Sequence, residues 1–85
     1  MVKDMREIGA VTDYFAKIGV ISVKLSKPLK IGDKIHIRGT TTDFRQKVLS
    51  MQIDKNKVER AKAKDEIGIK VNDRVRKSDK IFLVE

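Results

Sequence analysis

The residues of this sequence that could do chemistry are mostly positively charged, and they form three clusters. The chain carries 20 Lys and Arg against 12 Asp and Glu, a formal net charge of +8 over 85 residues. In the first cluster, Lys34, His36 and Arg38 alternate along a predicted strand, which spaces their side chains about 7 Å apart on one outward face. The second cluster consists of Lys55, Lys57, Arg60, Lys62 and Lys64. The third cluster consists of Arg74, Arg76, Lys77 and Lys80.

These clusters predict contact with nucleic acid, because cationic side chains bind the phosphates of a polyanion. The alternative for each cluster is a solvated face that nearby acids partly neutralise. Tyr14 is the predicted stacking residue for an RNA base. Adjacent Tyr14 and Phe15 must point to opposite sides of a strand, and the Tyr hydroxyl tolerates water. The alternative for Tyr14 is a place at the rim of the fold.

The sequence favours no catalytic chemistry. A phosphate-binding loop needs a Gly-Lys dipeptide, and the sequence contains none. His36 is the only histidine, and its two cationic neighbours disfavour its use as an acid–base catalyst. One His without any Cys also predicts no metal site. Asp33, Asp65 and Asp79 are expected in turns, so a catalytic role stays open only if a pocket gathers several carboxylates. We therefore expect a protein that is not an enzyme and has no cofactor.

The elements that position these residues are predicted to be short strands. Ile and Val together number 19 and Leu only four, and β-branched side chains favour pleated sheets. Apolar and polar residues alternate over residues 6–15, 19–25, 33–38, 44–54, 67–71 and 80–84. Six short strands without a long helical stretch predict an all-β fold, a small closed six-stranded antiparallel β-barrel, because closure removes exposed sheet edges.

Three details of this prediction concern individual residues. Within 44–54 the alternation places Leu49, Met51 and Ile53 together on the inner face. Residues 29–33 are expected to form a tight turn in which Gly32 supplies a positive φ. Residues 55–66 fit either one helical turn or the end of a strand.

The chain as a whole is expected to be one soluble domain over residues 1–85. Its longest apolar run has four residues, from Ile81 to Val84, far short of the roughly 20 that cross a bilayer. No signal-peptide core is visible at the N-terminus, and the absence of Cys suits a reducing cytoplasm. With 38% charged residues, the composition leans towards a thermophilic source.

An ordered series of short motifs resembles a known domain over about residues 6–84. The series runs IGAVT at 8–12, IGV at 18–20, PLKIGDKI at 28–35, VLSMQI at 48–53, DEIGIKV at 65–71 and VRKSDKIF at 75–82. It is similar to the second domain of translational GTPases such as elongation factor Tu and initiation factor 2, a closed β-barrel with Gly-Asp turns. Lys64 and Ser78 stand where that family has Gly, so these residues must tolerate the turn geometry or the turn type must change.

The resemblance implies a module of the translation apparatus without a GTPase domain. In the larger factors this barrel contacts the aminoacyl end of tRNA and ribosomal RNA, and similar stand-alone barrels are associated with small translation-factor-like proteins. The leading hypothesis is therefore a non-catalytic barrel that contacts tRNA or rRNA through its basic faces. The alternative is a protein-interaction adaptor or accessory barrel for a separate enzyme or translation factor. A related barrel accompanies collagenase-like peptidases as an accessory domain.

Overall fold

The computed structural model describes residues 5–84, and no helix occurs in this part of the chain. The first five strands are β1 (Met5–Phe15), β2 (Val20–Leu25), β3 (Leu29–Lys30), β4 (Lys34–Arg38) and β5 (Asp43–Lys47). The other five are β6 (Met51–Ile53), β7 (Asn56–Val58), β8 (Arg60–Ala61), β9 (Glu66–Lys70) and β10 (Lys80–Val84). The predicted all-β class is confirmed. The open choice for residues 55–66 is decided in favour of strands.

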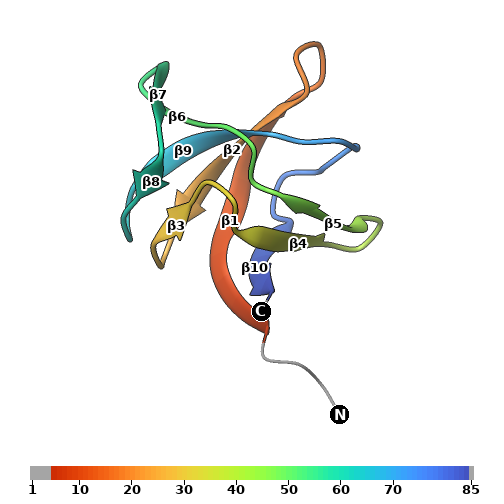
Figure 1. Ribbon diagram of the computed structural model, residues 1–85. Helices are drawn as coiled ribbons and strands as arrows, with labels where there is room; N and C mark the ends of the chain where they lie inside the picture. Colours follow the sequence, from red (N-terminus) through yellow and green to blue (C-terminus); the bar gives the residue numbers. More distant parts are fainter. Residues whose placement is uncertain (1–4, 85) are drawn as a thin grey trace.

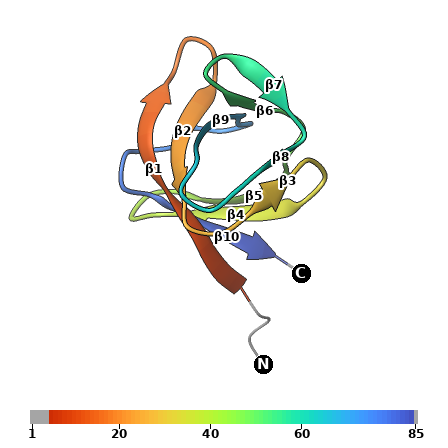
Figure 2. The ribbon, with the colours of Figure 1, turned by 90° about the vertical axis from the view of Figure 1, so that its left-hand side faces the viewer.

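Eight of the strands form one antiparallel sheet in the order β5-β4-β10-β1-β2-β9-β6-β7, and β3 pairs with β8 separately. The long strand β1 bends across the molecule and pairs with β10 near its start and with β2 along the rest (Figure 1). Gly9 permits the bend, because a Cβ there would lie 2.8 Å from both the Lys24 carbonyl oxygen and a Val23 methyl. The sheet curls around its apolar face (Figure 2).

The predicted closed six-stranded barrel is not confirmed, because the edge strands β5 and β7 do not pair with each other. The side chain of Gln46 spans part of the opening between β5 and the end of β9. The Gln46 amide on β5 donates to the Lys70 carbonyl oxygen at 2.9 Å and accepts from the Asn72 backbone N–H at 2.9 Å. Gln46 is only 8% exposed. The end of β9 is therefore tied to β5 through an amide rather than through a ladder of backbone bonds.

The single strand predicted over 44–54 is wrong, because the chain leaves its ladder at Val48. The Val48 N–H donates to the Asp33 carbonyl oxygen at 2.8 Å, and the Gly32 N–H donates to the Val48 carbonyl oxygen at 2.9 Å. These bonds fix Val48 against the turn after β3 and bury it completely. The alternation shifts as a result, and Leu49, predicted to face inward, is 74% exposed. Met51 is buried as predicted, and Ile53 is half-buried.

The core consists of the inward faces of these strands and is dominated by β-branched residues. Its completely buried members are Ile21, Val23, Ile35, Ile37, Val48, Ile69 and Ile81. They come from β2, β4, β9, β10 and the segment after β5. Neighbouring strands of the curled sheet thus enclose one apolar core.

Three equivalent four-residue turns carry the Asp residues that were predicted to lie in turns. In each turn one Asp side-chain oxygen accepts the backbone N–H of the residue three positions earlier. The distances are 3.1 Å for Asp33 to Lys30, 2.9 Å for Asp65 to Lys62 and 2.9 Å for Asp79 to Arg76.

The residue before each of these Asp residues lies in the left-handed region. Gly32 has φ 95°, which confirms its predicted role. Lys64 and Ser78 adopt φ 76° and 75°, so both tolerate the turn geometry without being Gly.

A candidate binding groove beside strands β3 and β8

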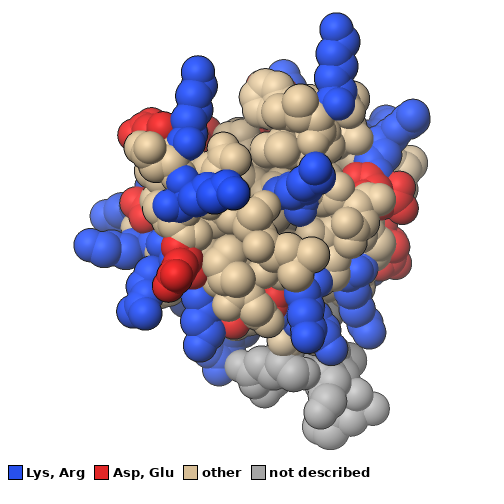
Figure 3. Space-filling model, turned by 45° about the horizontal axis from the view of Figure 1, so that its top comes forward, with Lys and Arg blue, Asp and Glu red and all other residues tan. Residues whose placement is uncertain are grey.

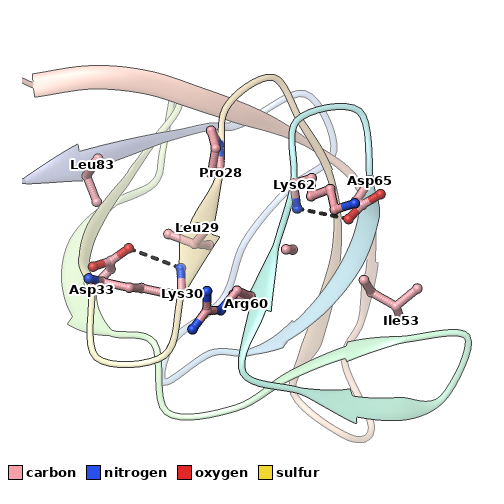
Figure 4. A pocket seen from close by; sticks show the side chains of 10 residues that line it. Pro28, Leu29, Lys30, Asp33, Ile53, Arg60, Lys62, Asp65 and Leu83 are labelled. Atoms are coloured by element: carbon pink, nitrogen blue, oxygen red, sulfur yellow. Dashed lines mark hydrogen bonds between the residues drawn. The ribbon is translucent and has the colours of Figure 1, made fainter.

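A cavity with a volume of about 740 Å³ lies beside the short β3–β8 pair (Figure 4). Leu29 of β3 pairs with Ala61 of β8, and these residues are 2% and 4% exposed. Because strand side chains alternate, the next pair, Lys30 and Arg60, projects to the exposed side. The apolar lining residues are Pro28, Leu29, Ile53, Ala61 and Leu83. The charged lining residues are Lys30, Asp33, Arg60, Lys62 and Asp65.

The acids of the groove have hydrogen-bond partners within their own turns, whereas its cations have no recorded ion pair in the described range. Asp33 and Asp65 each accept a backbone N–H of their own turn, as the dashed lines in Figure 4 show. For Lys30, Arg60 and Lys62 the structure records no ion pair with any residue of the described range 5–84. Lys30 and Arg60 are also direct cross-strand partners, and like charges placed opposite each other destabilise a strand pair.

The first predicted cluster is altered by the position of His36. Lys34 and Arg38 are exposed at the two ends of β4, as predicted, but His36 is buried at 6% exposure. The prediction that His36 is exposed is wrong, because β4 is an inner strand and its neighbours cover the face that His36 shares with Lys34 and Arg38. Phe82 of β10 lies on one side of His36 and Arg45 of β5 lies on the other.

The His36 ring is hydrogen-bonded to the side chain of Asp43 at the start of β5. This bond is the largest cause that lowers the pKa of Asp43 below its ordinary value of 3.8. The charges of His36, Arg38 and Arg45 lower this pKa further, while desolvation opposes them. The pair is therefore a structural contact of the β4–β5 hairpin.

The second cluster does not form a single site. Arg60 and Lys62 line the groove, whereas Lys55, in the turn after β6, lines a different cavity with Phe15 and Ile18. Lys57 on β7 and Lys64 in the turn before Asp65 are exposed and line neither of these two cavities.

The third cluster is also divided. Arg74 and Arg76 line a cavity of about 300 Å³ that Asp43 also lines. Lys77 is exposed in its turn, and Lys80 forms an ion pair with Glu7 at 3.4 Å. Figure 3 shows one face of the molecule, on which Lys and Arg side chains project mainly around the edge of a largely uncharged centre.

The aromatic pair near the end of β1 differs from the prediction for stacking. Tyr14 is half-buried and packs against the core, which corresponds to the alternative reading of a rim residue. Phe15 is 47% exposed, and the neighbouring Ile18 is 62% exposed. The exposed side chain of the pair is thus Phe15.

Two further findings concern the described residues 5–84. They contain no group of three or more His, Cys, Asp or Glu residues arranged to hold a metal ion. They also contain no helix that is long and apolar enough to cross a membrane.

Comparison with known proteins shows what this chain is similar to. It is 41% identical over 80 residues to an uncharacterized protease of Methanocaldococcus jannaschii and 38% identical over 77 residues to a collagenase of Porphyromonas gingivalis. These matches cover 93% and 88% of this chain but only 20% and 21% of the two relatives. The chain thus spans about a fifth of the length of these curated relatives. No family model matches the sequence.

A solved structure shares the fold. The C-terminal domain of a Geobacillus thermoleovorans protein described as a U32 peptidase superposes with a TM-score of 0.88, at 17% identity. The match covers 94% of this chain and 93% of that domain. A selenomethionine variant of the same domain gives a TM-score of 0.85 at 18% identity.

These comparisons overturn the main functional prediction. The relatives are named as a protease and a collagenase, and the matching solved domain comes from a U32 peptidase, not from a translational GTPase. The predicted kinship with the second domain of elongation factor Tu and initiation factor 2 is therefore wrong, as is the translation-related RNA-binding module. The expectation that the protein is not an enzyme also conflicts with these names. The alternative of an accessory domain for an enzyme fits the relatives better.

The groove itself was missed in the sequence, because its parts lie far apart along the chain. Leu29 and Ala61 come together only through the two-residue β3–β8 pairing, and Leu83 comes from the last strand. A basic residue three positions before Asp occurs at Lys30–Asp33 and Lys62–Asp65, but this pattern does not single out the groove, because Lys70–Asp73 and Arg76–Asp79 show it too and do not line the groove. The nucleic-acid contacts assigned to individual basic residues stay a prediction without support from the relatives.

Proposed function

We propose that this chain is an accessory domain of a U32 peptidase-type protein and that it does not itself cleave peptide bonds. The observation that carries the proposal is the similarity of nearly the whole chain to a segment making up only a fifth of proteins named as a protease and collagenases. A segment of that size leaves about four fifths of each relative to provide a catalytic site.

The roles of the acidic residues support a non-catalytic domain. Asp33, Asp65 and Asp79 each accept a backbone N–H within a turn, so their carboxylates stabilise the fold. Asp43 is engaged by His36. These residues therefore have structural partners, and the groove gathers cations around an apolar floor rather than a pair of free carboxylates.

A hydrolysis assay tests the proposal. The isolated chain and, in parallel, the full-length Porphyromonas relative would be incubated with denatured collagen and with a mixture of unrelated peptides, and products would be identified by mass spectrometry. We expect no cleavage by the isolated chain under conditions in which the relative cleaves its substrate. Cleavage that co-purifies with the chain and is lost in a groove variant such as Asp65→Asn, with the fold intact, would overturn the proposal.

A further inference from the structure

The groove beside β3 and β8 has an apolar floor large enough for side chains of another molecule. Pro28, Ile53 and Leu83 supply its accessible apolar surface, whereas Leu29 and Ala61 also line it but are only 2% and 4% exposed. Its volume of about 740 Å³ lies in the range of sites that bind small ligands, roughly 300–1,000 Å³. A polypeptide could place one or two apolar side chains here.

The cations at its mouth favour an acidic partner. Lys30 and Arg60 face each other across the strand pair, and in the described range the structure records no ion pair for either residue. The groove carboxylates Asp33 and Asp65 are committed to backbone N–H groups. Glu59 lies beside Lys30 and Arg60 and also makes no recorded ion pair in the described range, so neither cation is paired with this neighbouring carboxylate.

A carboxylate from outside would improve this arrangement. Placed between Lys30 and Arg60, it would remove their repulsion and gain charge-assisted hydrogen bonds, which are about twice as strong as neutral ones.

The position of the groove favours polypeptide over a free small acid. Leu83, which lines the groove, pairs with Arg6 at the start of β1. The first and last strands therefore run side by side next to the groove, and both ends of the described chain lie at this part of the molecule (Figure 1). In the relatives about four fifths of the chain lies outside the matched segment, so a longer protein with this fold has polypeptide near the groove.

We propose that this groove binds an extended polypeptide segment in which apolar side chains are flanked by carboxylates. An apolar side chain packs against Pro28 and Leu83, and a neighbouring carboxylate lies between Lys30 and Arg60. The inference goes beyond the accessory role and does not depend on it, because the groove exists whether or not the chain serves a peptidase.

The test is a titration of the full, nitrogen-15-labelled chain with short blocked peptides, followed by amide chemical shifts. The probe is acetyl-Glu-Leu-Asp-Leu-Glu-amide. One matched control has Ser in place of both Leu residues, and another has Lys in place of all acids. We expect saturable shifts at the groove residues with the probe, at least tenfold weaker binding of the Ser peptide, and no binding of the Lys peptide.

Charge variants locate the site. Arg60→Gln and Lys30→Gln should each weaken binding of the probe about tenfold, as loss of one charge-assisted contact predicts. Lys17→Gln removes an equal charge from the exposed turn between β1 and β2 and should leave binding unchanged. The amide spectrum of each variant shows directly whether it is folded.

Several results would overturn the inference. Equal binding of the Leu and Ser peptides would show attraction of charge without use of the apolar floor. Shifts confined to the exposed residues Phe15 and Ile18 would place the binding surface elsewhere. Absence of saturable binding, or unchanged affinity in folded Arg60→Gln, would also contradict it.

Discussion

Replacing Gln46 with Met should destabilise the domain, because the Gln46 amide ties β5 to the end of β9. Met has a similar length and is unbranched, so it can fill the same space without hydrogen-bonding. The substitution leaves the Lys70 carbonyl oxygen and the Asn72 N–H without their partners at 2.9 Å. A fully buried polar group that loses its partner costs about 1–3 kcal/mol, and the cost is smaller here because Lys70 and Asn72 are exposed residues that water can reach.

We therefore expect Gln46→Met to lower the free energy of unfolding by about 1–2 kcal/mol. A chain of 85 residues has a total stability of only about 4–12 kcal/mol at typical per-residue values, so the loss is large. Urea unfolding followed by circular dichroism measures it, with the linear extrapolation applied to both proteins.

The matched control is Gln52→Met on the exposed side of β6. The free energy of unfolding of this variant should stay within about 0.5 kcal/mol of the parent value, as for most surface substitutions. If Gln46→Met were equally neutral, the stability of the domain would not depend on the hydrogen bonds of Gln46 between β5 and the end of β9. That result would refute the reasoning.

Three further predictions concern turns and pH, each measured by the same urea unfolding. Gly32→Ala should lower the free energy of unfolding by about 1–2 kcal/mol, because φ is 95° there even though the space around a Cβ is open. Lys64→Gly in the equivalent turn should raise it by about 0.5–1 kcal/mol, because Lys64 also has a positive φ. The opposite order of these two effects would contradict the account of the turns. Gly39→Ala should cost about 2–4 kcal/mol, because its Cβ would meet the carboxylate of buried Asp79. The pKa of Asp43 is lowered in the folded protein, so its stabilising effect is present above the ordinary value of 3.8 and is lost as pH falls through the lowered pKa. The advantage of the parent over Asp43→Asn should thus be present at pH 5 and disappear at lower pH; an advantage that grew on acidification would contradict the pairing.

Much of the sheet could be predicted from the alternation of apolar and polar residues. Strands β2, β4, β9 and β10 lie within a residue of their predicted positions, because each has one face in the core. The pattern failed at Val48 and Leu49, where backbone bonds to the turn after β3 shift the alternation by one residue. It also failed at His36, because period two assigns a face but does not show that neighbouring strands cover that face.

The functional prediction failed for a different reason. Three of the six motifs that carried the resemblance contain the Asp of one and the same kind of turn, at Asp33, Asp65 and Asp79. Such turns meet a local geometric need of curled sheets, so they indicate the fold rather than the activity of the protein that contains it. The groove depends on the pairing of Leu29 with Ala61, and no local sequence pattern predicts a pairing of residues so far apart along the chain.

Exchange of the matched segment tests most directly whether this chain is an accessory domain of a peptidase-type protein. The 77-residue segment of the Porphyromonas gingivalis collagenase, 38% identical to this chain, would be deleted or replaced by this chain, and hydrolysis of collagen would be measured for each folded product. We predict that deletion lowers hydrolysis and that replacement restores most of it. Full activity after deletion, or a folded replacement as inactive as the deletion, would contradict the proposal.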